Sequence, residues 1–176
     1  ILLTQQFPEH QFGWKVMGAL LKQTNRISES LVPSQKAAEI TPQDAEAHNN
    51  LGITLKELGR LEESEASLRQ AITLKSDFIE AHSNLGVTLQ ELGRFEEAEA
   101  SLRQAIALKP NYAEAHYNLG GMLQELGRLE ESETSYRQAI ALKSDYAEAH
   151  YNLSNALKEL GRLEEAEASL RQAIAM

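Results

Sequence analysis

Residues 113–144, AEAHYNLGGMLQELGRLEESETSYRQAIALKS, decide how this chain folds, because the same pattern returns along its length. Shifted by 34 residues onto residues 79–110, the stretch is identical at 23 of 32 positions. A fixed period of this length is typical of a solenoid, in which copies of one supersecondary unit stack and bury a continuous core. The sequence therefore predicts a repeat architecture for the whole chain of 176 residues.

Each copy contains two helical patterns separated by a break. In the first pattern, apolar residues recur at spacings of four, four and three, which makes one stripe of an α-helix: Ala115, Leu119, Leu123 and Leu126. Gly127 then interrupts the pattern, and glycine is the usual residue where a helix ends in the left-handed conformation. A second stripe follows at Leu129, Ser132, Tyr136, Ala139 and Ile140. One hairpin cannot bury both stripes alone, so we expect an all-α solenoid of antiparallel helix pairs.

Five repeats fit the chain when this period is extended in both directions. The regular copies occupy residues 45–78, 79–112, 113–146 and 147–176. Residues 11–44 form a divergent copy, in which Asn25 stands at the turn, and asparagine tolerates the left-handed region as glycine does. Counting back by one more period places residues 1–10, which include ILLTQQF, at the end of an upstream repeat. We therefore expect residues 1–176 to be one solenoid fragment that is preceded by further sequence.

The residues at fixed places in this unit resemble those of the tetratricopeptide repeat family. The matching residues in the fourth repeat are Leu119, Gly120, Leu123, Gly127, Ser132, Tyr136 and Ala139. The proline that follows the second helix in the family is present as Pro42 and Pro110, and serine replaces it at Ser76 and Ser144. The resemblance covers nearly the whole chain and implies a right-handed superhelix whose first helices line the concave side. It also implies a class of function, since the family binds peptides and proteins.

Composition and charge exclude several kinds of partner. The chain has 17 Lys and Arg against 26 Asp and Glu, a formal net charge of −9, whereas nucleic acids and anionic membranes require clustered basic residues. It has no cysteine, which excludes disulfides and thiolate chemistry and fits a cytoplasmic location. No apolar run approaches the roughly 20 residues that a membrane-spanning helix needs.

Short motifs at the joints between repeats predict where helices begin. Three of them have the form of capping boxes, with Asp or Asn as the N-cap: Asp77-x-x-Glu80, Asn111-x-x-Glu114 and Asp145-x-x-Glu148. Glu65 and Arg69, like Glu99 and Arg103, have the spacing of an i,i+4 ion pair on one helix face. We therefore assign most of the charge to solvated helix surface.

One face of each predicted first helix is left after the apolar stripe is assigned to the core. In the second repeat this face carries Glu46, Asn50, Ile53 and Glu57, at steps of four, three and four. The asparagines of the regular repeats are Asn50, Asn84, Asn118 and Asn152. On the concave side that the resemblance implies, they form a column. Each amide then offers both a donor and an acceptor to the backbone of an extended peptide.

The segments AHNNLG and AHSNLG resemble in particular the repeats of O-linked N-acetylglucosamine transferases, whose asparagine ladder holds the substrate backbone. In an alternative interpretation the asparagines only bridge adjacent first helices. Two neighbouring rows vary between repeats, which indicates side-chain pockets or, equally, drift on an exposed face: Asn49, Ser83, Tyr117 and Tyr151 in one row, and Ile53, Val87 and Asn155 in the other. The two tyrosines supply aromatic contact area in the first row.

The sequence gives no support for catalytic or metal-binding chemistry. One histidine recurs per regular repeat, from His48 to His150, but one ligand per layer of roughly 10 Å cannot complete a tetrahedral site with bonds of about 2 Å. The carboxylate clamp of chaperone-binding members of the family needs successive basic residues, whereas Lys15 is followed by Asn49 and Ser83. There is no nucleophile–base pair and no phosphate-binding glycine loop. We expect no enzyme activity, no cofactor and no metal site.

These observations predict a non-enzymatic protein-interaction module whose concave face binds a neutral or basic peptide, or a partner protein. Three alternatives stay open: the substrate-recognition arm of a larger glycosyltransferase-type enzyme, a self-assembling scaffold, and a spacer without a ligand. The scaffold is considered because the last repeat keeps apolar residues that a further repeat would cover: Leu153, Leu157, Leu160, Leu163, Leu170 and Ile174. We also expect a homo-oligomer formed through exposed terminal repeats.

Overall fold

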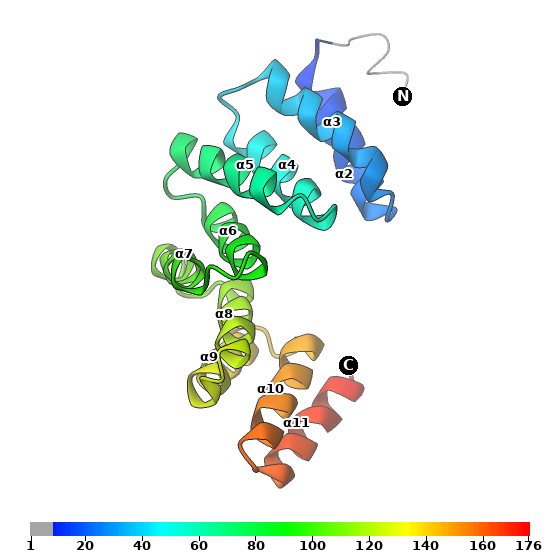
Figure 1. Ribbon diagram of the computed structural model, residues 1–176. Coiled ribbons are helices and arrows are strands. Elements are labelled where there is room, and N and C mark those ends of the chain that lie inside the picture. Colours follow the sequence, from blue (N-terminus) through cyan, green and yellow to red (C-terminus); the bar gives the residue numbers. More distant parts are fainter. Residues whose placement is uncertain (1–8) are drawn as a thin grey trace. The chain divides into compact units, whose positions relative to one another are not determined.

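The computed structural model describes residues 9–176, and within that range it contains ten α-helices and no strand (Figure 1). This confirms the all-α prediction. The upstream-repeat tail that the sequence predicts for the first ten residues falls, up to residue 8, outside the described part of the chain. The chain divides into two compact units, Ile1–Gly93 and Arg94–Met176, and each is described by itself.

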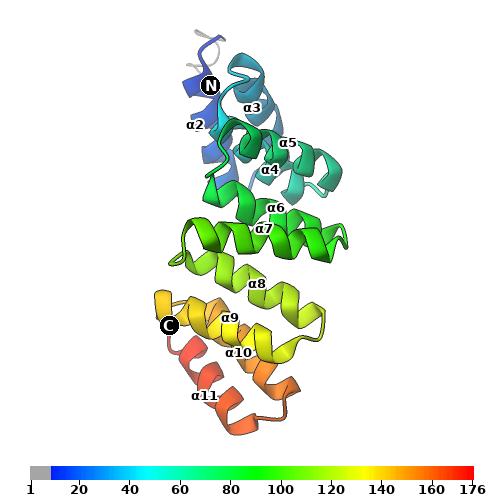
Figure 2. The same cartoon turned by 90° about the vertical axis from the view of Figure 1, so that its left-hand side faces the viewer.

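The described part of the first unit, residues 9–93, contains five helices that are joined by short turns. They are α2 (Gln11–Gln23), α3 (Ile27–Ile40), α4 (Ala45–Glu57), α5 (Leu61–Leu74) and α6 (Ile79–Glu91). Helices α2 and α3 form one pair and α4 and α5 the next, while α3 packs against α4 and α5 against α6 (Figures 1 and 2). Small residues permit this close packing: Ala37, Ala38 and Ala47 form one buried cluster, against which Trp14 and Leu51 lie.

The second unit repeats the same arrangement. Its helices are α7 (Phe95–Leu108), α8 (Ala113–Glu125), α9 (Leu129–Leu142), α10 (Ala147–Glu159) and α11 (Leu163–Ile174). Helix α7 packs against α8, α8 pairs with α9, α9 packs against α10, and α10 pairs with α11 (Figure 2). The core between α9, α10 and α11 contains Tyr136, Leu153, Ala156, Leu157 and Ala166.

The turn inside each hairpin has the left-handed residue that the sequence predicts. Gly59, Gly127 and Gly161 have φ values of 71°, 70° and 77°. Asn25 takes the same place in the divergent repeat with a φ of 57°, which confirms its assignment as the turn residue. The N–H group after each such residue closes the turn. In the fourth repeat, for example, the N–H of Arg128 donates to the carbonyl of Leu123 at 2.9 Å.

The predicted starts of three helices are wrong by one residue. The N-caps of α6, α8 and α10 are Phe78, Tyr112 and Tyr146, and none of these side chains makes a capping hydrogen bond. The reason is that each aromatic N–H donates to the carbonyl of the lysine three residues earlier, at 3.1–3.2 Å, which closes a turn before the helix starts. The lysine ammonium then lies over the aromatic ring, 4.3–5.3 Å from its centroid.

Each regular repeat has a histidine that fastens the loop before the first helix. Nε2 of His82 lies 2.9 Å from the carbonyl oxygen of Ser76, and Nε2 of His116 lies 2.9 Å from that of Pro110. His48 and His150 make the same contact with Pro42 and Ser144, at 3.0 and 3.3 Å. A carbonyl oxygen only accepts, so Nε2 must carry the proton and donate it. These histidines are therefore structural ties between loop and helix.

The core positions predicted from the repeat pattern are buried only in part: Ala115 and Leu123 are buried, but Leu126 at the end of the first stripe is 40% exposed, and Leu129 and Ile140 of the second stripe are half-buried. Leu85, Leu119 and Leu153 are 4–5% exposed, whereas Leu51 is only half-buried. Three of these leucines are followed by a glycine, Gly52, Gly86 or Gly120, which lets the paired helices approach closely, whereas Leu153 is followed by Ser154. A Cβ atom on Gly52 would lie 2.6 Å from Cγ of Leu68 on α5, so no larger residue fits without displacement.

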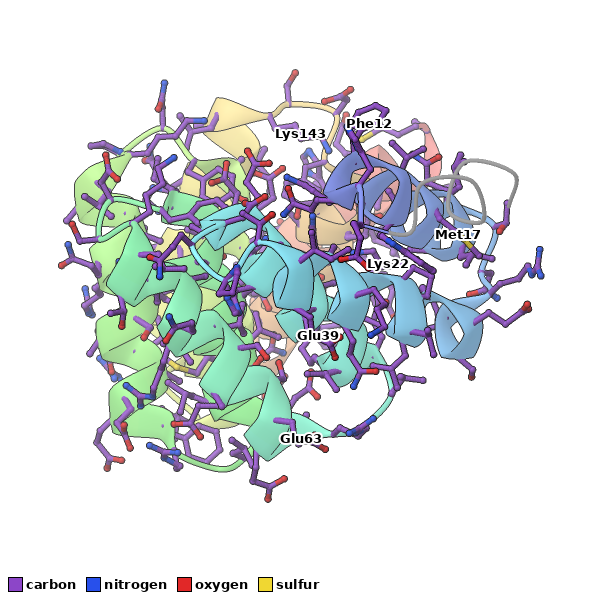
Figure 3. All side chains as sticks on the ribbon, turned by 90° about the horizontal axis from the view of Figure 1, so that it is seen from above. Phe12, Met17, Lys22, Glu39, Glu63 and Lys143 are labelled. Carbon is purple, nitrogen blue, oxygen red and sulfur yellow. The ribbon has the colours of Figure 1, made fainter. Side chains whose placement is uncertain are left out.

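Arginine and glutamate side chains form ion pairs along the second helices. The i,i+4 pairs are confirmed, with Glu65–Arg69 at 2.9 Å and Glu99–Arg103 at 2.7 Å. Arg128 also reaches Glu99 of the preceding second helix at 2.6 Å. Glu63 projects from the start of α5 into solvent (Figure 3), and its side chain is 58% exposed, whereas the side chains of Glu65 and Glu99 are only 15% and 21% exposed. Exposed pairs of this kind stabilise a fold by at most about 1 kcal/mol each.

Candidate peptide-binding face

The predicted asparagines lie on the side of the first helices that also carries the two variable rows, which we name the first-helix face. In the first unit the face belongs to α4 and α6 and holds Asn50 and Asn84. In the second unit it belongs to α8 and α10 and holds Asn118 and Asn152. All four asparagines are half-buried, so each keeps part of its surface in contact with solvent.

In the first unit a hydrogen bond between two side-chain amides links the first helices of the face. Nδ2 of Asn84 donates to Oδ1 of Asn49 at 3.0 Å, and Asn49 is itself only 6% exposed. Within residues 9–176, Oδ1 of Asn84 accepts no hydrogen bond. The amide nitrogen therefore bridges two adjacent first helices, as in the alternative interpretation, while the amide oxygen stays available to a ligand.

A lysine neutralises the acidic groups at the beginning of this face. Nζ of Lys15 lies 3.0 Å from Asp44 and 2.8 Å from Glu46. Asp44 also caps α4, because its Oδ1 accepts the N–H groups of Glu46 and Ala47. Partial burial alone would raise the pKa of the Asp44 carboxyl, but the hydrogen bonds from Lys15, Gln11 and the Ala47 N–H outweigh it. Its pKa therefore lies below the ordinary value.

In the second unit a tyrosine takes the place of Asn49. Nδ2 of Asn152 donates to the hydroxyl of Tyr117 at 3.0 Å, the same step of 35 residues that separates Asn84 from Asn49. The Tyr117 ring lies 5.0 Å from the Tyr146 ring and 5.9 Å from the Tyr136 ring, centroid to centroid. In the second unit, a hydrogen bond between asparagine and tyrosine and a cluster of three aromatic rings thus take the place of the hydrogen-bonded amide pair of the first unit.

Tyr136 reaches this cluster from the second helix of its hairpin. It is 1% exposed and lies under Gly120, where an added Cβ would be 2.8 Å from two ring carbons. Its hydroxyl ends beside Gly121 and donates to Oε1 of Gln124 at 3.2 Å. Burial, with a smaller contribution from Tyr117, raises the pKa of Tyr136, so the phenol stays protonated and remains a donor at neutral pH.

The other predicted site residues differ in their solvent exposure. Ser83 is buried, whereas Tyr151 is 52% exposed. The half-buried members of the second variable row are Ile53, Val87 and Asn155. Asn155 borders an open cavity of about 430 Å³ with Gln124, Lys158 and Glu159, and Nε2 of Gln124 donates to Glu159 at 2.6 Å. This cavity is polar and lies at the C-terminal end of the face.

A second cavity, also of about 430 Å³, lies away from the first-helix face. It is formed between α9 and α11 over α10, with Ile140, Leu153 and Leu157 as its apolar walls. Arg137 and Glu165, which are both among its lining residues, form an ion pair at 3.0 Å. None of the predicted site residues lines it.

Two structural findings bear on other classes of site. Among the residues that the structure describes, no group of three or more His, Cys, Asp or Glu side chains is placed to hold a metal ion. Across the same range, no helix combines the length and the apolar character that crossing a membrane requires. The face itself offers amides, tyrosine rings and carboxylates, which bind by hydrogen bonding, stacking and charge.

The paired helices, the left-handed turn residue and the recurring first-helix face define a helical repeat protein built for recognition. Comparison with family models gives its family. Tetratricopeptide repeat models match residues 83–146, 123–176 and 34–66, and a further TPR repeat model matches residues 54–93. The chain belongs to the tetratricopeptide repeat family. Proteins of this family are generally non-catalytic and act as protein-interaction modules.

Solved structures of similar proteins agree with this fold. A thermophilic TPR protein of Thermus thermophilus is 25% identical, covers 94% of this chain and 91% of its own, and has a TM-score of 0.83. MamA is 23% identical over 90% of this chain and 92% of its own, with a TM-score of 0.74. YrrB, described as a TPR protein with an unusual peptide-binding site, is 22% identical over 98% of this chain and 89% of its own, with a TM-score of 0.66. The comparison with curated proteins gives no match.

Proposed function

We propose that this protein is a non-enzymatic, cytoplasmic interaction module whose first-helix face binds an extended peptide, or an extended segment of a partner protein. In each unit the asparagines contact the backbone of the ligand: Asn50, Asn84, Asn118 and Asn152. The variable rows contact its side chains, directly or by positioning the asparagines: Asn49, Ser83, Tyr117, Tyr151, Ile53, Val87 and Asn155.

The fixed amide of Asn84 is the observation that carries this proposal. Its nitrogen is held by Asn49 at 3.0 Å, and its oxygen is left without a partner among the described residues. A side chain that is already ordered loses little conformational entropy on binding, so its hydrogen bond to a peptide N–H contributes more fully to affinity. The tie of Asn152 to Tyr117 orders a second asparagine in the same way.

Two similarities support a peptide as the ligand. The segments AHNNLG and AHSNLG resemble the repeats of O-linked N-acetylglucosamine transferases, whose asparagine ladder holds substrate backbone. YrrB is described as having a peptide-binding site. The first similarity also favours a second candidate function, in which the same face serves as the substrate-recognition arm of a glycosyltransferase-type enzyme. In both cases the net charge of −9 favours neutral or basic ligands.

Replacing Asn84 and Asn152 together by alanine should weaken peptide binding tenfold or more. Each lost hydrogen bond is worth on the order of 1 kcal/mol, and about 1.4 kcal/mol corresponds to a factor of ten. The measurement is fluorescence anisotropy with labelled twelve-residue peptides chosen from an array of extended sequences. A double variant that binds these peptides as tightly as the unmodified protein would contradict the proposal.

The chain offers matched controls for the structural part of this effect. Asn49→Ala and Tyr117→Phe each remove the partner that holds an asparagine but keep the asparagine itself. If the asparagines only tie helices together, these controls should lower the melting temperature and the affinity as much as Asn84→Ala and Asn152→Ala do. If the asparagines contact the ligand, the controls lose only the ordering of the amide and should weaken binding less than Asn84→Ala and Asn152→Ala do.

A homo-oligomer is a separate proposal, and the apolar surface of α11 favours it. Leu170 is 36% exposed and Ile174 is 77% exposed, whereas Leu68 and Leu102, at the same place in earlier repeats as Leu170, are fully buried. Covering this surface with a second copy would stabilise it. Light scattering over a concentration series should detect a dimer or larger species that Leu170→Glu reduces to a monomer. A strict monomer at high concentration would exclude this association.

A further inference from the structure

The first-helix faces of both units are acidic, so charge alone does not distinguish what each unit binds. Helix α6 of the first unit carries Glu80 and Glu91 and no Lys or Arg. Helix α8 of the second unit carries Glu114 and Glu125 and no basic residue. Helix α10 adds Glu148 near its start, and its one basic residue, Lys158, follows ten residues later, which is roughly 15 Å along the helix.

The carboxylates at the start of α8 and α10 are not neutralised by the protein. Glu114 and Glu148 are both exposed, and neither forms an ion pair with a residue in the described part of the chain. Of the equivalent residues in the first unit, Glu46 is paired with Lys15 at 2.8 Å, whereas Glu80 is exposed and, like Glu114 and Glu148, has no ion pair with a described residue. Both glutamates lie close enough to Tyr146 to raise the pKa of its hydroxyl, after burial as the main cause. Glu148 follows Tyr146 by two residues, and Glu114 lies one turn before Tyr117, the residue whose ring packs against Tyr146.

Two aromatic residues stand beside these carboxylates in the sequence, and their rings pack against each other. Tyr117, one turn after Glu114 on α8, packs against Tyr146 at 5.0 Å and is half-buried, so part of its ring is open to solvent. Tyr146 already holds a cation, because Nζ of Lys143 lies 4.3 Å from its ring centroid. In the first unit the residues at the place of Tyr117 are Asn49 and Ser83, which have no ring. Among the described residues of the first unit, Phe78 is the equivalent of Tyr146 and is buried, so a partly open ring at the place of Tyr117 beside these carboxylates is a feature of the second unit.

We propose that the first-helix face of α8 and α10 binds an arginine side chain of the extended peptide, with its guanidinium against Tyr117 and paired with Glu114 and Glu148. The planar guanidinium suits this surface, because it stacks on aromatic rings and pairs with carboxylates through several N–H donors. The inference rests on the proposed function. It adds which unit and which residues make the face prefer a basic ligand.

The test compares arginine with citrulline, which has the same shape and no charge. Two sets of twelve-residue peptides carry arginine or citrulline at the sixth position, in random flanks of Ser, Thr, Ala and Asn. The unmodified protein should bind the arginine set about tenfold more tightly, by fluorescence anisotropy at about 0.1 M salt. Glu114→Gln with Glu148→Gln should remove most of that preference, because the affinity for the arginine set falls further than the affinity for the citrulline set. Tyr117→Ser, which installs the residue of Ser83, should reduce the preference severalfold.

Glu46→Gln with Glu80→Gln is the matched control, because it changes the net charge equally in the first unit. It should alter the preference for arginine less than twofold. Equal losses from both pairs of substitutions would mean general charge attraction and would overturn the assignment to the second unit. Equal binding of arginine and citrulline sets by the unmodified protein would overturn it as well.

The failure of this inference and that of the proposed function can be told apart. If both peptide sets bind equally and Asn84→Ala with Asn152→Ala weakens both, the asparagine face stands and the arginine site does not. If the asparagine variant binds normally but the arginine preference disappears with Glu114 and Glu148, the arginine site stands alone. If neither set binds the unmodified protein, both proposals fall.

Discussion

Replacing Tyr136 by alanine should lower the free energy of unfolding by about 3–5 kcal/mol, the cost typical of removing a buried aromatic side chain. Tyr136 is 1% exposed and belongs to the core cluster that includes Leu153, Ala156 and Leu157. Its loss would leave an unfilled space under Gly120 and remove the ring that packs against Tyr117. Urea denaturation followed by circular dichroism measures the change. A loss below about 1 kcal/mol would mean that the surrounding helices close the space.

A pair of substitutions tests why this repeat has a second glycine. The other regular repeats combine leucine at the place of Tyr136 with Ile53, Val87 or Asn155 at the place of Gly121. A Cβ on Gly121 would lie 3.5 Å from the Tyr136 hydroxyl, so the two methyl groups of a valine would press against it. Gly121→Val alone should cost about 1–3 kcal/mol by overpacking. The double variant with Tyr136→Leu should lose less stability than the sum of the losses from the two single substitutions. A loss equal to that sum would contradict this account.

The sequence sufficed for the repeat, the helix pairs and the turns, because these depend on periodic patterns and on local backbone preferences. Asn25 is the clearest case, since its left-handed φ of 57° follows from its place in the period. The helix starts at Phe78, Tyr112 and Tyr146 were not predicted from the sequence, because the capping-box motif is recognised only by the short polar side chain at the N-cap. It does not include the competing turn that the preceding lysine closes, with its carbonyl and with its ammonium over the ring.

The residues that form contacts between repeats could be found in the sequence, but their hydrogen-bond partners could not. The asparagine row was visible in the sequence, but its partners lie 35 residues away, and a repeat pattern does not specify bonds between side chains at variable positions. One signal was available. The repeat with Tyr136 in place of leucine is also the repeat with Gly121 in place of a larger residue, and this joint change indicates contact between the two positions.

Leu119→Ala should be nearly as destabilising, at about 2–5 kcal/mol. Leu119 is 5% exposed on α8, in the middle of the second unit, and the neighbouring Gly120 brings α9 so close that the space cannot be filled by other side chains. Leu126→Ala is the control at the C-cap of the same helix, because Leu126 is 40% exposed and its loss should cost less than about 1 kcal/mol. Similar losses from both substitutions would contradict the assignment of Leu119 to the core.

Trp14 makes the Leu119 experiment more specific. It is the one tryptophan of the chain and lies in the first unit, packed against Ala37, Ala38 and Ala47. Each repeat is stabilised by its own core and by contacts with its neighbours. The loss of stability caused by a core substitution therefore decreases with distance from the substituted repeat. In the Leu119→Ala variant, the urea midpoint from circular dichroism should therefore fall further than the midpoint from Trp14 fluorescence. Coincident midpoints would show that the whole chain unfolds in one step and that the loss at Leu119 is shared by every repeat.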